Sequence, residues 1–386
     1  MKQRIIALID CDSFFVSCER VDNPALQDNP VCVMTGGGNK GIIISRSKEA
    51  KSIGIKMGAP YFQVQKTHPQ AICIPARHQR YSELSHQVMN IIKTFTPDVE
   101  EVSIDEAYAD LTGLNKLYNS SYTALITKIR QTILDQTQIP VSIGLSSSKT
   151  LAKLASDYAK NIGGIYIIRP NRIIETIGNT NIEDICGVGS KSAKTLKFNG
   201  IFTVKDFLLQ DNAWIKKLMG IHGLNLKFEL SGIITSPVNS SPQAPQSIQD
   251  TKSFEEFTNN LPFLHSQLNY HVHNASQKLR RWNGYCSEIG VILKTKDFNS
   301  TTIYEKLPIA TNSVFTLKNT ASHLLDKLYH SKSLYRSIGI DLKKLSYNQE
   351  CQQSLFENLK QDDDKLSRVL DELEQKFGKD IVRLGL

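Results

Sequence analysis

The chain has 386 residues, of which 40% are hydrophobic and 22% are charged, and it carries a formal net charge of +8. This length exceeds one compact core and fits about two to four domains, which excludes a single small domain. The composition is that of an ordinary globular protein, and no apolar run approaches the roughly 18 residues of a membrane span, which excludes a membrane role.

The N-terminal part of the chain alternates strand and helix patterns. Residues 5–9 form an apolar run that ends at Asp10 without a small-residue cleavage site, so we expect a buried strand and not a signal peptide. The elements predicted after it are a helix at 84–95, strands at 99–103 and 107–111 around a tight turn, a helix at 125–133 and a strand at 141–145. This order is typical of a split βαβ sheet in an α+β protein.

Three further segments differ in composition from this pattern. Residues 16–80 are Gly-rich and basic and predict a small subdomain inserted over the active edge of the sheet. Residues 170–232 are helical, with glycine turns at 187–189 and 220–223 that suit helix-hairpin-helix elements. Residues 233–249 are rich in Pro, Ser and Gln, which indicates an interdomain linker.

A second small α+β domain is predicted after the linker, followed by a tail that begins near residue 351. The expected elements are strands at 252–257, 287–296 and 335–345 and helices at 262–281 and 314–329. The net positive charge is compatible with nucleic acid as a partner, although many solvated surfaces are equally basic.

The cysteines are scattered and form neither a CxxC pair nor a spacing typical of zinc ligands. Unpaired thiols suit a reducing compartment, so we expect a cytoplasmic protein with no zinc site and no disulfide framework. The seven residues are Cys11, Cys18, Cys32, Cys73, Cys186, Cys286 and Cys351.

Three carboxylates are predicted to meet at one edge of the first sheet. Asp10 ends the first buried strand, and Asp105 and Glu106 occupy the turn between the next two. Clustered carboxylates need cations, and their hard oxygens favour Mg²⁺; two such ions about 4 Å apart support phosphoryl transfer. Alternatively, each aspartate caps a strand or a turn, as aspartates often do. Three acids at one edge favour the metal site.

Long motifs in a fixed order resemble the Y-family translesion DNA polymerases, in particular their UmuC/DinB-like branch. The motifs are IDCDSFFVSCE, SRSKEAKSIGIKMGAPYF, SIDEAYADLT and SIGLSSSKTLAKLASDYAK. The resemblance covers essentially the whole chain and is weakest after the linker. It implies template-directed transfer of deoxynucleotides to a primer 3′-hydroxyl, with low processivity, release of pyrophosphate and a role in the SOS response to DNA damage.

The resemblance implies a right-hand polymerase fold with a split-βαβ palm, small fingers, a helix-hairpin-helix thumb and an α+β little finger. It also implies two Mg²⁺ ions, with Mn²⁺ as an alternative, bound by Asp10, Asp105, Glu106 and the backbone carbonyl of Cys11. The expected boundaries are palm 1–15 and 81–168, fingers 16–80, thumb 169–232, linker 233–249, little finger 250–348 and C-terminal tail 349–386.

A nucleotide site follows from the same resemblance. Phe15 falls where the family keeps a ring that excludes a ribose 2′-hydroxyl, although either Phe14 or Phe15 can instead pack in the core. Many relatives have Tyr and Arg where this chain has Lys48 and Lys51, which replaces a planar guanidinium by a point charge. The implied contacts are Cys11, Phe14, Phe15, Ser45, Lys48, Lys51 and Lys160.

DNA and protein partners are predicted from basic residues and one short peptide. A lysine-bearing helix face and a Gly-X-Gly turn suit phosphate contacts, although each also occurs as a solvated face or an ordinary turn. The candidates for DNA binding are Lys149, Lys153, Gly187, Gly189, Lys191, Arg280, Arg281 and Arg336. Gln352, Ser354, Leu355 and Phe356 resemble a peptide that binds the bacterial sliding clamp, or they pack on their own domain. We expect a nucleoid-associated monomer, with a regulatory accessory subunit as a further partner.

Two other functions fit part of this pattern. A two-metal nuclease would also use clustered carboxylates and helix-hairpin-helix turns, but it does not explain Phe15 or the lysines near the triphosphate. A non-catalytic scaffold bound to the clamp would tolerate loss of the three acids, which are all present.

Overall fold

The computed structural model describes residues 4–36, 40–347 and 360–377. The chain divides into two compact units, Met1–Pro242 and Gln243–Leu386, and each is described by itself. The division falls within the segment 233–249 that the sequence marks as a linker.

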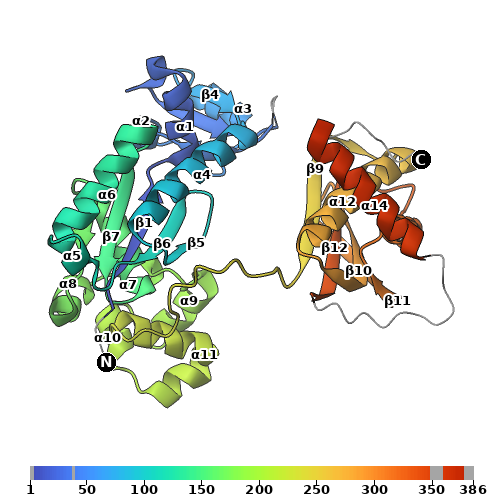
Figure 1. Ribbon diagram of the computed structural model, residues 1–386. Helices are drawn as coiled ribbons and strands as arrows, with labels where there is room; N and C mark the ends of the chain where they lie inside the picture. The colour runs from blue at the N-terminus through green and yellow to red at the C-terminus, as the bar shows by residue number, and fades with distance from the viewer. Residues whose placement is uncertain (1–3, 37–39, 348–359, 378–386) are drawn as a thin grey trace. The chain divides into compact units, whose positions relative to one another are not determined.

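A five-stranded sheet forms the centre of the first unit (Figure 1). Its strand order is β5-β6-β1-β7-β8, and β1 runs antiparallel to both of its neighbours. All six residues of β1 are buried, because its apolar side chains alternate between two covered faces. The strands are β1 (Ile6–Cys11), β5 (Val99–Glu101), β6 (Glu106–Asp110), β7 (Val141–Ser146) and β8 (Ile165–Ile167).

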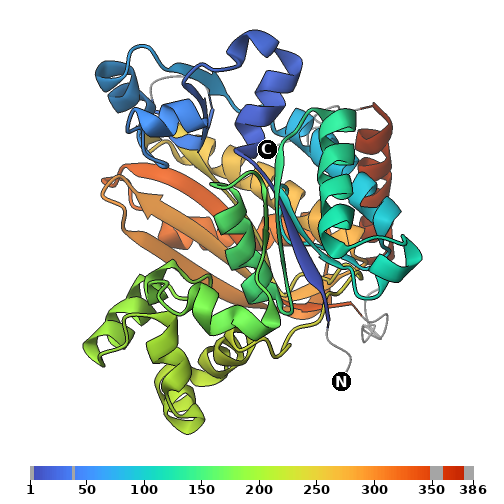
Figure 2. The same ribbon diagram turned by 90° about the vertical axis from the view of Figure 1, so that its left-hand side faces the viewer.

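Helices cover both faces of this sheet (Figure 2). Ala7 and Ile9 pack in the core with α4 and α6, whereas Ile6 and Leu8 face α7 on the other side. The helix α7 therefore lies directly over the strand that carries Asp10. The helices of this part are α4 (His78–Phe95), α5 (Leu114–Leu117), α6 (Tyr122–Thr137) and α7 (Lys149–Ala159).

The inserted segment forms a three-stranded sheet with a small core of its own. The strand β2 lies in the middle, antiparallel to β3 and parallel to β4. The helix α1 and one face of β2 join the insertion to the five-stranded sheet, because Phe14, Val16, Val31 and Val33 pack in the core of that sheet. The elements are α1 (Phe14–Asp22), η1 (Pro24–Leu26), β2 (Val31–Met34), β3 (Ile43–Arg46), α2 (Lys48–Ser52), α3 (Tyr61–Thr67) and β4 (Ile72–Pro75).

Short helices follow the sheet, as predicted from the composition of 170–232. The turn before α9 needs Gly187, which has φ +94°, a region that residues with a Cβ rarely adopt. The second predicted turn is a break inside α11, where Gly220 has φ +71°. The elements are η2 (Pro170–Arg172), α8 (Ile173–Ile177), η3 (Ile182–Asp184), α9 (Ser190–Phe198), α10 (Val204–Leu209) and α11 (Asn212–Leu230).

The second unit is a four-stranded antiparallel sheet, order β11-β10-β12-β9, with α12 and α13 packed on it. Its first strand begins at Ile248, two residues inside the segment predicted as linker, because Ile248 is buried in this core. The elements are β9 (Ile248–Thr258), α12 (Leu261–Arg281), β10 (Tyr285–Thr295), β11 (Ser300–Thr311), α13 (Val314–Leu328), β12 (Tyr335–Ser346) and α14 (Lys360–Phe377). Both units mix helices with sheets, so the predicted α+β class is confirmed. Within the described ranges, no helix is both long and apolar enough to span a membrane.

Candidate active site

The ends of β1 and β6 bring the predicted carboxylates to one edge of the five-stranded sheet. Asp10 pairs directly with Glu106 in the antiparallel register of these strands. The backbone N–H of Cys11 donates to the carbonyl of Asp105 at 2.8 Å, which fixes the turn next to the end of β1. Strand pairing alone therefore places all three residues at the same edge.

Two lysines from α7 and its C-terminal cap reach these carboxylates. The ammonium of Lys153 lies 3.1 Å from Asp10 Oδ2 and 2.5 Å from Glu106 Oε2, and that of Lys160 lies 2.9 Å from Asp10 Oδ2. Burial opposes the charge of Lys153, but the hydrogen bond to Glu106 and the charge of Asp10 outweigh it and raise the pKa of Lys153. Asp10 and Glu106 thus converge on a single cationic group.

The carboxylate of Asp105 is directed elsewhere in this arrangement. It accepts a hydrogen bond from Ser103 Oγ at 2.5 Å, within the turn itself. Among the residues described, no three His, Cys, Asp or Glu side chains converge closely enough to hold a metal ion. The carboxylate oxygens and the carbonyl of Cys11 are the hard donors that Mg²⁺ prefers, so the donor set fits this ion in its chemistry.

Asp12 adds a further acid next to this edge. It accepts a hydrogen bond from Ser142 Oγ at 2.8 Å. Burial raises the pKa of Asp12, and the bond from Ser142 and the positive charge of Lys48 act in the opposite direction. The charge of Lys48 therefore acts on the active edge from the inserted subdomain.

Phe14 and Phe15 have different environments. Phe14 is 3% exposed and its ring belongs to the main core, and its role as a nucleotide contact stays a prediction. Phe15 is half-buried and stacks on Tyr81, with ring centroids 4.7 Å apart and planes at 18°. One face of the Phe15 ring therefore rests on a second aromatic ring, which the sequence pattern did not indicate.

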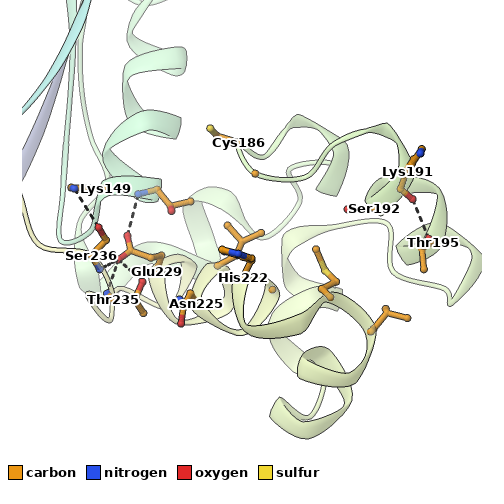
Figure 3. A pocket seen from close by; sticks show the side chains of 16 residues that line it. Lys149, Cys186, Lys191, Ser192, Thr195, His222, Asn225, Glu229, Thr235 and Ser236 are labelled. Carbon is orange, nitrogen blue, oxygen red and sulfur yellow. Dashed lines mark hydrogen bonds between the residues drawn. The ribbon is translucent and has the colours of Figure 1, made fainter. Parts of the chain in front are cut away.

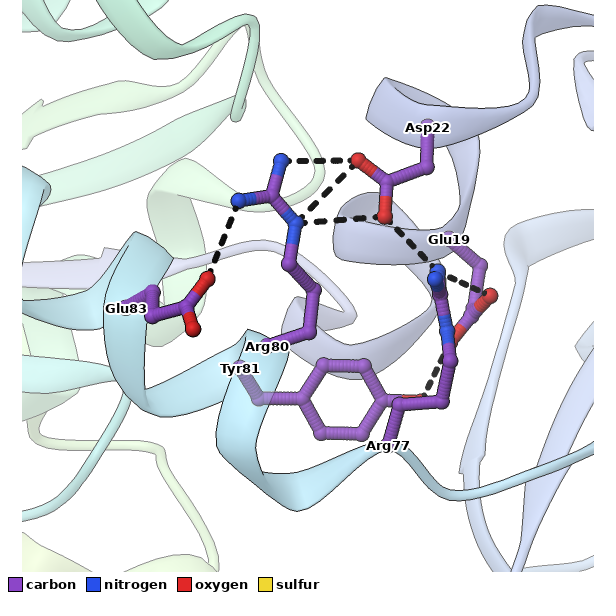
Figure 4. Close-up of polar contacts among 6 residues, drawn as sticks. All are labelled: Glu19, Asp22, Arg77, Arg80, Tyr81 and Glu83. Atoms are coloured by element: carbon purple, nitrogen blue, oxygen red, sulfur yellow. Dashed lines mark hydrogen bonds and ion pairs between the residues drawn. The ribbon is translucent and has the colours of Figure 1, made fainter. Parts of the chain in front are cut away.

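A network of ion pairs between α1 and α4 holds Tyr81 (Figure 4). The hydroxyl of Tyr81 donates to Glu19 at 2.6 Å, and Arg77 donates to both oxygens of Glu19 at 2.9 and 2.7 Å. Arg77 and Arg80 also reach Asp22, at 2.9 and 2.8 Å. Burial and the neighbouring Glu19 raise the pKa of Tyr81, so the phenol stays protonated as a donor. This network fixes the ring beneath Phe15.

The remaining predicted nucleotide contacts lie on the inserted subdomain. Ser45 is a buried residue of β3, whereas Lys48 and Lys51 are exposed on α2. Exposed ammonium groups keep their hydration and can reach an anion without loss of internal contacts. The roles of these three residues stay predictions.

The structure changes the assignment of two lysines that were predicted to bind DNA. Lys149 donates to both carboxylate oxygens of Glu100, at 2.8 and 2.6 Å, and its side chain is 12% exposed. Lys153 faces Asp10 and Glu106 instead of the surface. Spacing along α7 showed that these lysines share one face of the helix, but it could not show which acids that face meets.

Gly187 and Lys191 line a cavity of about 660 Å³ in the helical segment, together with His222 and Glu229 (Figure 3). Gly189 is the N-cap residue of α9, and Lys191 follows in its first turn. This placement leaves the predicted phosphate contact untested.

The basic residues of the second unit that were predicted to bind DNA differ in their exposure and in their contacts within the protein. The side chain of Arg280 is 6% exposed and makes hydrogen bonds of 2.6 and 2.7 Å to both oxygens of Asp371, and its DNA contact stays a prediction. Arg281 bonds to Gln277 in its own helix. The guanidinium of Arg336 lies 3.7 Å from the centroid of the exposed Phe298 ring. The predicted clamp-binding residues, Gln352, Ser354, Leu355 and Phe356, lie outside the described residues.

Comparison with known proteins gives consistent matches along the chain. Residues 9–157 match the model of the impB/mucB/samB family, and residues 245–355 match that of its C-terminal domain. The chain is 31% identical to Protein UmuC of Salmonella typhimurium, over 97% of this chain and 92% of that protein. It is 30% identical to DNA polymerase IV 1 of Bacillus subtilis, over 100% of this chain and 93% of that protein.

Solved structures agree with these sequence matches. A chimeric Y-family DNA polymerase superimposes with a TM-score of 0.78 at 26% identity, covering 89% of this chain and 100% of the chimera. An insertion ternary complex of Dbh DNA polymerase gives a TM-score of 0.62 at 26% identity, with the same coverage.

Proposed function

Because the chain belongs to the impB/mucB/samB family and is a Y-family DNA polymerase that acts in translesion synthesis, we propose that nucleotidyl transfer takes place at the sheet edge formed by Asp10, Asp105 and Glu106. The observation that carries this proposal is the pairing of Asp10 with Glu106, whose carboxylates share the ammonium of Lys153. Like charges held this close need a cation between them, which is what a polymerase active site supplies.

Y-family polymerases depend on metal ions, and we propose two Mg²⁺ ions here, with Mn²⁺ as an alternative. Asp10, Asp105, Glu106 and the carbonyl of Cys11 would hold them. Bound ions lower the pKa of the attacking 3′-hydroxyl and neutralise the departing pyrophosphate. Lys160 is held at the carboxylates by Asp10 and is suited to bind the triphosphate there.

The incoming nucleotide would lie between the sheet edge and the inserted subdomain. Lys48 and Lys51 bind its phosphates as point charges, and Ser45 adds a hydroxyl donor. The ring of Phe15 packs against the deoxyribose and excludes a 2′-hydroxyl. Its backing by Tyr81 supports this role, since a ring that cannot tilt away discriminates better.

We assign the palm to residues 1–15 and 81–168, the fingers to 16–80, the thumb to 169–232 and the little finger to 250–348. The similar Dbh DNA polymerase forms an insertion ternary complex, and we extend primer-template DNA and a deoxynucleotide to this chain as substrates. Low processivity follows if the protein binds DNA through few phosphate contacts. The sliding clamp, bound through 352–356, would then supply processivity, and a regulatory accessory subunit stays part of the proposal.

A primed template with all four deoxynucleotides and Mg²⁺ tests this function. Wild-type protein should extend the primer, and Asp105→Ala should abolish extension while the protein stays folded. Shortening of the primer by the wild type would instead indicate a nuclease, and neither extension nor shortening would indicate a scaffold. Ser121→Ala is a matched control, because Ser121 only caps α6, through a bond to the N–H of Ala124.

A further inference from the structure

Cys32 and Cys73 meet in the sheet of the inserted subdomain, although they are far apart in the sequence. They are directly paired in the parallel register of β2 and β4. Their side chains belong to one small core. Cys32 is fully buried, whereas Cys73 is half-exposed at the edge of the same small core. The sequence predicted no disulfide, because cysteine spacing does not reveal a parallel pairing.

The backbone geometry suits a covalent bond between these residues. Neighbouring strands lie about 4.8 Å apart, within the range of about 4.4 to 6.8 Å that separates the Cα atoms of disulfide-bonded cysteines. We propose that Cys32 and Cys73 form a redox-sensitive dithiol site, which a hydroperoxide such as hydrogen peroxide converts to a reversible disulfide.

The two thiols have different roles in this reaction. A hydrogen bond from Cys32 lowers the pKa of Cys73, and the same bond together with burial raises the pKa of Cys32. Cys73, the more exposed of the two thiols, therefore attacks one peroxide oxygen as a thiolate, which breaks the O–O bond and gives a sulfenic acid and hydroxide. The hydroxide takes up the proton that the thiol had released and becomes water. Cys32 then attacks the sulfenic sulfur, and its proton leaves with the hydroxyl as a second water. Each disulfide consumes one peroxide, and a thiol reductant reverses the bond.

The loop that this bond would close contains β3, α2 and α3. The proposed nucleotide contacts Ser45, Lys48 and Lys51 all lie within it. A disulfide between β2 and β4 would restrain this loop and oppose its unfolding. That the disulfide would also restrain residues that bind the nucleotide rests on the proposed function, whereas formation of the disulfide does not.

Peptide mapping of the full chain tests the proposal. A Cys186→Ser, Cys351→Ser variant would be treated with hydrogen peroxide, blocked with N-ethylmaleimide, digested and analysed by mass spectrometry. We expect a peptide in which Cys32 is linked to Cys73, its loss after dithiothreitol, and several-fold slower proteolysis within 33–72 in the oxidised protein. Adding Cys73→Ser should remove both effects, and adding Cys286→Ser, on the second unit, should remove neither.

Alkylation of both Cys32 and Cys73 after peroxide treatment would overturn the proposal, if wild-type Cys186 is oxidised under the same conditions. So would linkage of Cys73 to any cysteine other than Cys32. The same peptide mapping can be done on the wild-type protein, so the test does not depend on whether a variant folds. Peptide mapping detects the disulfide and does not measure DNA synthesis. A map without the disulfide would therefore not contradict the proposed function, and a failed Asp105→Ala assay would not contradict the dithiol site.

Discussion

Charged side chains are arranged differently in the two units of the chain. At the edge of the five-stranded sheet, two acids with little exposure, Asp10 and Glu106, are gathered by lysines that come from a different element. On the four-stranded sheet, by contrast, carboxylates of similar exposure each have a lysine of their own, and Asp250 has His271 as a second partner. Examples of such pairs are Lys278 with Asp250, Lys343 with Asp341 and Lys344 with Glu288.

This difference separates charges that serve function from charges that serve the fold. A cluster of like charges at low exposure is unfavourable by itself and is typical of active sites. A carboxylate that has a cation of its own requires no function to explain it, and a pair whose lysine is largely exposed contributes about 0 to 1 kcal/mol. The basic residues of the second unit are therefore weaker markers of DNA binding than their number suggested, and the DNA contacts of Arg280, Arg281 and Arg336 stay predictions.

Lys153→Met removes the lysine that Asp10 and Glu106 share, and it has the largest effect expected of the three substitutions that test this comparison. Removing the shared ammonium leaves Glu106 without its lysine and Asp10 with Lys160 alone, so we expect primer extension to slow by about 100- to 1,000-fold. Single-turnover extension measures this loss. Lys149→Met, on the same helix but paired with Glu100, should stay within about tenfold of wild type; equal losses in the two variants would contradict a specific role for Lys153.

Arg280→Met tests whether the bidentate ion pair between Arg280 and Asp371 stabilises the second unit. The substitution leaves Asp371 without its bidentate partner, so unfolding of this unit should cost about 2 to 4 kcal/mol less. Hydrogen exchange of amides in β10 and β12 of the full chain measures the change. Lys278→Met, whose side chain is 51% exposed, should cost less than about 1 kcal/mol. If Arg280→Met instead lowers the affinity for DNA and leaves the stability of this unit unchanged, Arg280 is a DNA contact.

Phe15→Ala gives the smallest of the three expected effects and separates site from core within the first unit. Without the ring, a ribose 2′-hydroxyl meets no obstacle, so discrimination against ribonucleotides should fall by about 10- to 100-fold. Primer extension measures this discrimination as the ratio of deoxyribonucleotide to ribonucleotide incorporation. Phe14→Leu should lower stability and keep discrimination, because Phe14 is core. Unchanged sugar selection in Phe15→Ala would remove the assignment.

The strands and their carboxylates could be predicted from the sequence, because apolar periodicity marks β1 and β6 and the acids stand at their ends. The partners of charged residues could not. Helical spacing placed Lys149 and Lys153 on one face of α7, but tertiary packing alone decides that Glu100 meets one and Glu106 the other. Arg280 likewise meets Asp371 through the packing of α14, which local composition does not encode.

The central claim is that Asp10, Asp105 and Glu106 act as one catalytic centre for DNA synthesis. Single-turnover extension by Asp10→Asn, Glu106→Gln and the double variant, with Mg²⁺ and at saturating deoxynucleotide, tests it most directly. Groups that act as a unit are not additive, so each single variant should lose at least about 1,000-fold and the double variant little more. Losses below about tenfold in the single variants, or losses that multiply in the double variant, would contradict a shared centre.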